Sequence, residues 1–458
     1  MFISGLPVRK NSPEILLINP WIHDFAAYDF WAKPVGLLTL ASILRQHGLN
    51  VSYMDCLDRF HHNMPKTDPH ARNGRGPYLK TRALNPEGLH DVNRNFSRYG
   101  IKKRWFIEDL RATPRPDLVL VTSLMTYWYP GVKETIEIIK EIFPKTPLIL
   151  GGIYATLCYS HALQQSGADI VVKGQGIEEL LELTKKLTGF TPVNKQGGPE
   201  FNADILDTYP YPAFDLQHQV NYVPLITSKG CPFACSYCAS NFLNPGFKQR
   251  SPESVIQEIE YWHKKYKVKD FVFYDDALLV NSANHAVPML EGIIKKGYNI
   301  CFHTPNAIHM REITETNAIL MFKAGFRTLR LGLETTLFED RSSIDRKVTE
   351  YDFKKAVTCL KSAGFKKNNT GAYLLAGLPG QTIDSVKASI KTVKQTGITP
   401  IIAYYTPIPH TEMWSRAVAS SRYDLESDPI FTNKAILPCR LDPFSWETIS
   451  SFKKLVFS

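Results

Sequence analysis

The sequence Gly230-Cys-Pro-Phe-Ala-Cys-Ser-Tyr-Cys238 holds three cysteines, Cys231, Cys235 and Cys238, in the spacing C-x3-C-x2-C. It follows a strand-like run at residues 222–228, so we expect it to form a tight loop. Three thiolates are one fewer than the four that close a structural zinc site or an ordinary iron–sulfur cubane. The spacing therefore indicates a metal centre with one open position. Ordinary buried cysteines, or a zinc knuckle with a distant fourth ligand, are the alternatives.

An open iron is what the reductive chemistry of S-adenosylmethionine (SAM) requires. A [4Fe-4S] cluster held by three cysteines leaves one iron free to bind a small ligand. SAM can bind to this iron, and one electron from the cluster can then cleave a carbon–sulfur bond of SAM. The cofactor supplies this radical chemistry, and the protein supplies position and electrostatics. Because the spacing alone can occur by chance, the rest of the chain has to support the interpretation.

Length and composition are those of a globular protein. The chain has 458 residues, enough for two to four domains, with 44% hydrophobic and 21% charged residues. No apolar run is long enough to span a bilayer. Residues 1–10 have their charges after a very short apolar stretch, the reverse of a secretory signal. We therefore expect a cytoplasmic protein, and clustered thiols agree with a reducing compartment.

The net charge of +10 is unevenly distributed. Residues 56–115 alone contain 13 Lys and Arg against 6 Asp and Glu, a local excess of +7. Such a segment could attract nucleic acid, an anionic cofactor or an acidic substrate. No aromatic-rich RNA-binding signature accompanies the charge, so a solvated surface insertion is favoured and no nucleic-acid partner is expected.

The N-terminal half alternates strands with helices, which predicts an α/β fold with a doubly wound parallel sheet. Expected strands are 15–19, 51–54, 118–121, 148–150 and 169–172, and expected helices are 34–47, 131–143 and 177–187. Ligands of such sheets bind beyond the carboxyl ends of the strands. The contact loops should therefore be 19–21, 122–126, 151–156 and 174–178.

This half resembles the cobalamin-binding domains that precede many radical SAM catalytic domains. The resemblance runs through residues 15–20, 117–124, 151–156 and 169–178. It implies cobalamin contacts at Ser123, Leu124, Gly151, Gly152, Thr156, Gly174 and Glu178. The cobalt-ligating Asp-x-His-x-x-Gly motif of related corrinoid domains is absent, which implies cobalamin bound without a protein imidazole. His61 and His62 lack the motif's glycine, and we interpret them as surface histidines. A sheet of this kind can also be kept as a docking scaffold.

Residues 56–115 interrupt the predicted sheet between its second and third strands. Only Lys102 to Leu110 has a convincing helical pattern. A loop of this length is usually functional or disordered. Because it follows the carboxyl end of a strand, we expect it to cover the cofactor or the substrate.

After linker-like residues 191–199, the strand–helix alternation restarts. Expected strands are 222–228, 270–274, 299–303, 328–333, 371–376 and 401–405. Ser251 and Pro252 begin a helix with the apolar stripe Val255, Ile259 and Trp262. Six β/α units predict a partial (β/α)6 TIM-like barrel whose active site lies at the strand carboxyl ends. The expected domains are therefore 1–190, 200–411 and a short extension, 412–458.

Residues 221–411 resemble the radical SAM superfamily, in which the residue before the last cysteine is usually aromatic, as Tyr237 is. Polar or glycine-rich residues follow every predicted strand of this half. The resemblance implies SAM contacts at Tyr237, Asp275, Asp276, Glu334, Lys347 (or its neighbour Arg346), Gly377, Gly380 and Pro407. Asp275-Asp276 replaces the family's Gly-Gly-Glu element. His303 and Asn306 are further candidates for substrate contact or proton transfer, although a structural role fits His303 as well.

The two resemblances together imply a radical SAM enzyme that uses cobalamin, most simply to methylate an unactivated carbon of a small-molecule or peptide substrate. Its electrons would come from a donor such as flavodoxin or ferredoxin. Ring closure, rearrangement or oxidation is the alternative use of the radical. A methylthiotransferase fits poorly, because only Cys56 and Cys158 precede the cluster loop. An iron–sulfur or zinc sensor that binds nucleic acid would have no need of six aligned strand ends.

Overall fold

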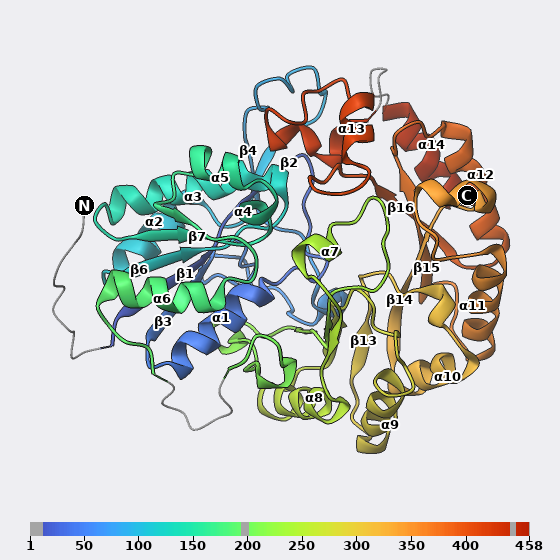
Figure 1. Ribbon diagram of the computed structural model, residues 1–458, viewed down its shortest axis with the longest axis horizontal. Helices are drawn as coiled ribbons and strands as arrows, with labels where there is room; N and C mark the ends of the chain where they lie inside the picture. The colour runs from blue at the N-terminus through green and yellow to red at the C-terminus, as the bar shows by residue number, and fades with distance from the viewer. Residues whose placement is uncertain (1–11, 194–200, 440–445, 458) are drawn as a thin grey trace. The chain divides into compact units, whose positions relative to one another are not determined.

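The computed structural model describes residues 12–193, 201–439 and 446–457, which divide into two compact units (Figure 1). The first unit extends to Val220 and includes Asp428–Ile430, and the second begins at Asn221. The N-terminal segment and most of the predicted linker lie outside the described residues. In the part of the chain that is described, no helix combines the length and apolar character that a membrane crossing needs.

The first unit contains the predicted parallel sheet, with strand order β3-β1-β6-β7-β8. Its strands are β1 (Glu14–Asn19), β3 (Asn50–Asp55), β6 (Leu118–Val121), β7 (Leu148–Leu150) and β8 (Ile170–Val171). Its helices are α1 (Val35–Gln46), α2 (Lys103–Ala112), α3 (Tyr129–Ile142), α4 (Ile153–Leu157), α5 (Tyr159–Gln165) and α6 (Ile177–Thr188). The chain runs outward from β1 in both directions, so the sheet is doubly wound as expected.

Alternation along β1 divides the hydrophobic core between the two faces of this sheet. Leu16 and Ile18 pack with residues of α2 and α3 such as Phe106. Ile15 and Leu17 pack on the opposite face with residues of α1 and α6. Both faces are therefore covered by helices, which explains why the central strands β1, β6 and β7 are largely apolar.

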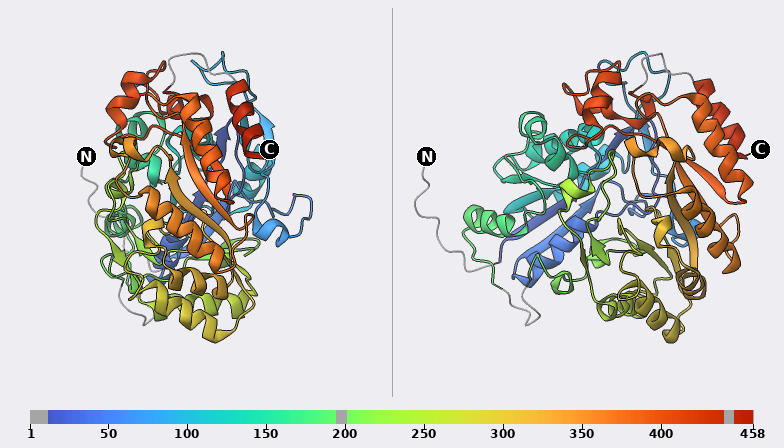
Figure 2. Two further views of the ribbon diagram at one scale, coloured as in Figure 1. Left: turned by 90° about the vertical axis from the view of Figure 1, so that its right-hand side faces the viewer. Right: turned by 45° about the vertical axis from the view of Figure 1, so that its right-hand side comes forward.

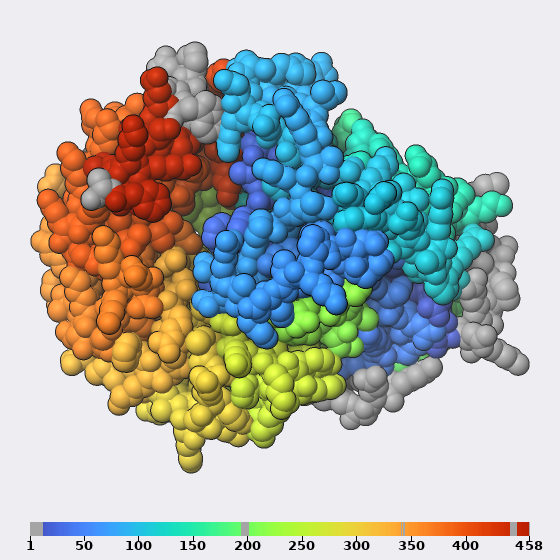
Figure 3. All heavy atoms as spheres, turned by 180° about the vertical axis from the view of Figure 1, so that it is seen from behind, coloured from blue at the N-terminus to red at the C-terminus, as the bar shows by residue number. Residues whose placement is uncertain are grey.

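The insertion at 56–115 has more structure than its composition predicted. The helix expected there is α2, but two short strands of the insertion, β4 and β5, were not expected. Together with β2, which precedes the insertion, they form an antiparallel sheet of order β2-β5-β4. Its strands are β2 (Ile22–Asp24), β4 (Lys80–Arg82) and β5 (Ser97–Tyr99). Strands of three residues are too short for a visible alternation, which is why the pattern did not reveal them. Figure 3 shows much of the insertion, in blue, at the surface.

The interpretation of His61 as a surface histidine is wrong. Its side chain is 3% exposed, because the ring stacks on Trp105 of α2 and Nε2 hydrogen-bonds to the Asp109 carboxylate at 2.9 Å. His62 is exposed, as expected.

The second unit is the predicted six-stranded parallel barrel sheet, with strands in sequence order from β9 to β16. Its strands are β9 (Val223–Leu225), β12 (Asp270–Phe273), β13 (Cys301–His303), β14 (Phe326–Glu334), β15 (Thr370–Ala376) and β16 (Thr399–Tyr404). The helices between them are α8 (Pro252–Tyr266), α9 (Ala286–Lys296), α10 (Glu315–Ala324), α11 (Glu350–Ser362) and α12 (Ile383–Gln395). In Figures 1 and 2 these helices line the outer side of the sheet. As predicted, the Ser251 hydroxyl caps α8 by accepting the Ser254 N–H.

The strand predicted at 222–228 is interrupted. After β9 the chain forms β10 (Ser228–Lys229), which pairs antiparallel with β11 (Lys248–Gln249). The segment between these two short strands contains the three cysteines and α7 (Ser240–Leu243). A hairpin therefore closes the base of the cysteine loop.

The C-terminal extension contains α13 (Trp414–Ser420) and α14 (Trp446–Phe457). Helix α14 contacts α12 and the edge strand β16, and the Lys394 ammonium donates to the Leu455 carbonyl at 2.9 Å. Helix α14 therefore packs against the β16 edge of the barrel sheet.

Candidate functional site

The cysteine loop depends on a glycine at its start. Gly230 has a φ of +79°, and a Cβ there would lie 1.8 Å from the Gly246 carbonyl oxygen. Only glycine fits this close approach of two backbone segments. The loop then turns within itself, with the Cys238 N–H donating to the Cys235 carbonyl at 3.1 Å.

All three cysteines are free thiols, with Cys231 and Cys235 partly buried and Cys238 exposed. Burial raises the pKa of Cys231 and of Cys235, to about 11 for Cys235. Iron binds the thiolate, so metal binding at this loop has to displace three protons.

Ser240 forms one hydrogen bond within the cysteine loop and one to the segment that follows strand β12. The Ser240 N–H donates to the Cys238 sulfur at 3.4 Å, and the Ser240 hydroxyl donates to the Asp276 carboxylate at 2.5 Å. Burial raises the pKa of Asp276. The structure thus brings Asp276 and the cysteine loop together.

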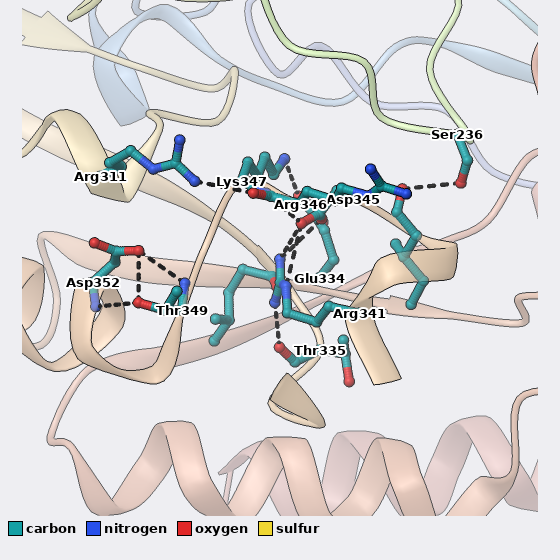
Figure 4. A network of polar contacts seen from close by, with 12 residues as sticks. Ser236, Arg311, Glu334, Thr335, Arg341, Asp345, Arg346, Lys347, Thr349 and Asp352 are labelled. Atoms are coloured by element: carbon teal, nitrogen blue, oxygen red, sulfur yellow. Dashed lines mark hydrogen bonds and ion pairs between the residues drawn. The ribbon is translucent and has the colours of Figure 1, made fainter. Parts of the chain in front are cut away.

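Glu334 and Lys347 are buried and form one hydrogen-bonded group with the partly buried Tyr237 (Figure 4 labels Glu334 and Lys347). The Lys347 ammonium donates to the Glu334 carboxylate at 2.9 Å and to the Tyr237 hydroxyl at 3.1 Å. Burial by itself would lower the pKa of Lys347, but Glu334, Cys235 and Asp345 together outweigh burial and raise that pKa. The lysine is therefore charged at neutral pH.

Glu334 has a strained backbone at the end of β14. Its φ is +63°, which residues other than glycine rarely adopt, and the pairing of β14 with β15 shifts register between Gly332 and Glu334. Strain of this kind persists only where the surroundings enforce it, and it is frequent at functional sites.

A second buried ion pair holds the segment that carries Lys347. Arg341 Nη2 donates to both carboxylate oxygens of Asp345, at 2.8 and 2.9 Å, and Nη1 donates to the carbonyls of Leu333 and Thr335. The Ser236 hydroxyl of the cysteine loop donates to the Ile344 carbonyl at 2.9 Å. Figure 4 shows these contacts, together with the one from Arg311 to the Arg346 carbonyl. Arg346 itself is exposed.

The carboxylate of Asp275 is buried, and only one of its two oxygens accepts hydrogen bonds from the residues that precede the cysteine loop. Oδ1 accepts from the Thr227 N–H, the Thr227 hydroxyl and the Ser228 hydroxyl. Oδ2 has no hydrogen-bond partner among the described residues. Burial raises the pKa of this carboxyl to about 6.

The glycine-rich turn after β15 is held by Gln381, whose side chain accepts the Gly377 N–H at 2.8 Å and donates to the Leu375 carbonyl at 2.9 Å. Gly377 and Gly380 both have positive φ. A Cβ at Gly380 would meet nothing within 4 Å, so this part of the turn faces open space. Pro407 is buried after β16.

His303 is a core residue, which agrees with the structural role that the sequence also allowed. It is 0% exposed, and its ring nitrogens pair with Asp270 and Thr328 at 3.0 Å each. Asn306 donates to the Tyr274 carbonyl at 2.7 Å.

Sequence reasoning missed His309. Its Nε2 lies 3.6 Å from the Cys231 sulfur, and its ring packs on Phe233. Burial, then Lys347 and Arg311, lower the pKa of His309 to about 3, so the imidazole is neutral. No local pattern marked this residue, because the contact joins segments 78 residues apart.

In the first unit, the predicted loops at the carboxyl edge of the sheet meet through hydrogen bonds. The Ser123 hydroxyl donates to the Gly151 carbonyl, and Gly174 N–H donates to the Thr156 hydroxyl. Gly152 has a φ of +99°, and a Cβ there would lie 2.3 Å from the Ser123 carbonyl. Leu124, which follows β6, and Glu178, in the first turn of α6, are exposed at the same edge.

Two family descriptions match the chain. Residues 225–393 match the radical SAM superfamily, and residues 94–184 match the B12 binding domain. The first match contains the cysteine loop and all of the predicted SAM contacts except Pro407.

Curated relatives are distant. An uncharacterised methyltransferase of Pyrococcus horikoshii is 26% identical over 329 residues, which are 67% of this chain and 70% of the relative. An anaerobic magnesium-protoporphyrin IX monomethyl ester cyclase of Rubrivivax gelatinosus is 23% identical, over 66% of this chain and 58% of the relative. A cytidylyl-2-hydroxyethylphosphonate methyltransferase of Streptomyces wedmorensis is 19% identical, over 92% of this chain and 85% of the relative.

Among solved structures, the radical SAM methyltransferase TsrM from Kitasatospora setae, with cobalamin and a [4Fe-4S] cluster bound, superposes with a TM-score of 0.65. It is 18% identical, and the match covers 89% of this chain and 75% of TsrM. At this identity the likeness establishes the fold.

Proposed function

Because the chain belongs to the radical SAM superfamily and carries a B12-binding domain before its radical SAM domain, we propose that it is an enzyme that methylates an unactivated carbon with SAM and cobalamin. One observation carries the proposal: the three-cysteine loop lies at the carboxyl end of a barrel strand in a chain that also has a B12-type sheet. The relatives that are named methyltransferases agree with it.

Cys231, Cys235 and Cys238 are proposed to hold a [4Fe-4S] cluster. Three free thiols on one tight loop fit a cluster with an open iron better than a closed four-ligand site. When bound, the cluster supplies the electron that cleaves SAM. The protein's part is to position SAM and to exclude other acceptors.

The hydrogen-bonded group of Tyr237, Glu334 and Lys347 is proposed to bind the amino-acid end of SAM. A lysine ammonium has three N–H donors, of which Glu334 and Tyr237 accept two. The third can donate to the SAM carboxylate. The unpartnered Oδ2 of Asp275 suits the SAM ammonium, with Asp276 beside it.

Gly377, Gly380 and Pro407 are proposed to form the adenine end of the SAM site, where the positive-φ turn lets the backbone come close to a planar ligand. In the first unit, cobalamin is proposed to contact Ser123, Leu124, Gly151, Gly152, Thr156, Gly174 and Glu178. The insertion at 56–115 is proposed to cover a bound cofactor or substrate.

We further propose a small-molecule or peptide substrate and a flavodoxin- or ferredoxin-type electron donor. Both would meet the enzyme in a reducing compartment such as the cytoplasm, where the thiols that hold the cluster stay reduced. Nucleic acid is not expected as a substrate.

Radical cyclisation without methyl transfer is the second candidate, and the similarity to magnesium-protoporphyrin cyclases favours it specifically. The two candidates differ in the nucleoside products. Methylation should yield S-adenosylhomocysteine together with 5′-deoxyadenosine, whereas cyclisation should yield no S-adenosylhomocysteine.

The test is anaerobic reconstitution of the chain with iron and sulfide, followed by incubation with SAM, cobalamin and a reductant and mass analysis of the nucleosides. We expect about four irons per chain and SAM cleavage. The replacement of all three cysteines by alanine should abolish both. A colourless protein that holds one zinc ion and leaves SAM intact would contradict the proposal.

A further inference from the structure

Three metal-ligating side chains meet in the insertion of the first unit, outside the sites described above. His61, His62 and Asp109 each offer one ligand atom, and these atoms all lie within 4.8 Å of one another. The histidines follow β3 and the carboxylate belongs to α2, so the tertiary fold brings them together. We propose that they form a binding site for a divalent cation of the zinc class.

The ligand distances suit a single small ion. Zinc binds imidazole nitrogen and carboxylate oxygen at about 2.1 Å, so two ligands of a tetrahedral ion are about 3.4 Å apart. His61 Nε2 and Asp109 Oδ2 are 2.9 Å apart. The rings of His61 and His62 lie with their centroids 4.1 Å apart. A shift of a few tenths of an ångström would therefore admit the ion between His61 and Asp109.

The site is held in place on one side and open on the other. The His61 ring stacks parallel to Trp105, at 5.4 Å and 5°. Trp105 and Asp109 are four residues apart on α2, so one face of the helix presents both the stacking ring and the carboxylate. His62 is exposed, which leaves room for a water molecule as the fourth ligand.

Binding of a cation would replace two contacts that Asn63 makes with His61 and His62. In the structure, the Asn63 N–H donates to His61 Nδ1 at 3.2 Å, and the Asn63 side-chain amide contacts His62 Nε2 at 3.0 Å. Coordination through His61 Nε2 moves the ring proton to Nδ1, so the Asn63 N–H has to turn away. Asn63 is exposed, and water can replace both contacts.

His218 lies just outside the proposed ligand set. Its ring centroid is 6.0 Å from that of His61, and its Nδ1 is bonded to the Asp58 carboxylate at 2.5 Å. Outer groups of this kind orient ligands and typically change metal affinity by about 10- to 100-fold when removed.

A cation at this site would join the start of the insertion to its closing helix. His61 and Asp109 are 48 residues apart, and a bond between them restrains the intervening chain. The site would thereby stabilise the insertion whether or not cobalamin or SAM is bound.

The test uses the full-length chain with Cys231, Cys235 and Cys238 replaced by alanine, so that the cluster thiols cannot compete for metal. Co2+ titration should show one tetrahedral ion per chain by its visible absorption, without thiolate charge-transfer bands, and Zn2+ should displace it. His62→Ala and Asp109→Asn should each weaken zinc binding by at least about 100-fold, more than the loss of an outer group. His90→Ala, at an exposed histidine of the same insertion, should leave the affinity unchanged.

Because His62 is exposed, His62→Ala should fold normally, and circular dichroism verifies this. No cobalt binding, or equal affinity of the triple-alanine chain with and without His62→Ala, would overturn the site. Thiolate charge-transfer bands in the triple-alanine chain would also overturn it, because they would place the ion on one of the five remaining cysteines.

Discussion

The buried Lys347–Glu334 pair is the residue-scale feature on which the proposed SAM site depends. Both side chains are less than a tenth exposed, at 7% and 6%, so neither charge can be solvated by water. A buried pair need not stabilise a protein relative to an apolar pair, but the removal of one partner leaves the other charge uncompensated. We therefore expect the pair to be present for SAM binding and not for stability. The fold nevertheless depends on both partners being present, because either charge alone would be buried without a counter-charge.

Lys347→Met should lower the free energy of unfolding by about 3–5 kcal/mol, because it strands the Glu334 carboxylate. Adding Glu334→Gln to this variant should recover part of the loss. Lys354→Met, in the exposed Lys354–Glu350 pair of α11, should cost less than about 1 kcal/mol. Urea denaturation measures all three, and equal losses for the two lysines would contradict the burial argument.

Asp55, at the end of β3, gives a pH-dependent prediction. Burial, followed by the charge of Asp58, raises the pKa of this carboxyl to about 6 in the folded chain. The unfolded chain ionises near pH 4, so the folded state binds the extra proton between pH 4 and 6 and loses stability as the pH rises through that window.

Asp55→Asn keeps the side-chain shape and removes this titration. The difference in free energy of unfolding between the variant and the natural chain should therefore grow in favour of the variant by about 1–2 kcal/mol between pH 4 and pH 7. This figure is smaller than the full pKa shift implies, because the Asp55 side chain is partly exposed. Denaturation at a series of pH values measures the difference. A difference that is constant with pH would show that Asp55 titrates normally.

At the scale of single elements, the hairpin at the base of the cysteine loop should control cluster loading. Gly230→Ala forces a Cβ within 1.8 Å of the Gly246 carbonyl, so the loop has to open. We expect the iron content after reconstitution to fall below half that of the natural chain. Gly246→Ala is the matched control, because Gly246 also has a left-handed φ of +80° but a Cβ there meets nothing within 4 Å. Equal iron loss in both variants would implicate backbone strain and not the contact.

Helix α11 begins with a capping box. The Thr349 hydroxyl accepts the Asp352 N–H at 3.1 Å, and the Asp352 carboxylate accepts the Thr349 N–H at 2.9 Å. Thr349→Ala should destabilise the chain by about 0.5–2 kcal/mol. Thr358→Ala, at an exposed position within the same helix, should change the stability by less than about 0.5 kcal/mol. Chemical denaturation of the two variants distinguishes the cap from a general effect of losing a threonine.

At the scale of the whole molecule, the two units should load their cofactors separately. Gly152→Ala should weaken cobalamin binding by about 10- to 100-fold, because a strained backbone and a contact of 2.3 Å with the Ser123 carbonyl disturb the loop. The same variant should retain its full iron content. Gly36→Ala, where a Cβ in α1 meets nothing within 4 Å, should bind both cofactors normally. Absorption spectra and iron analysis give the two readouts independently.

The sequence predicted most of the architecture because the relevant signals are local. Strands β6 and β7 have the predicted bounds, and the cap of α8 is the predicted Ser251. The short strands β2, β4 and β5 escaped prediction, since three residues cannot show a period. The individual residues Tyr237, Glu334 and Lys347 were proposed from resemblance, but nothing in the sequence indicated that they bond to one another.

By itself, the sequence determined the α/β class, the two successive parallel sheets and the open three-cysteine loop, because strand alternation, helix caps and cysteine spacing are short-range properties of the chain. The tertiary structure alone decided that His61 is buried against Trp105, that His303 belongs to the core and that His309 reaches Cys231. Each of these depends on contacts between residues 25 to 78 positions apart. Burial and pairing across such separations arise only when the chain has folded.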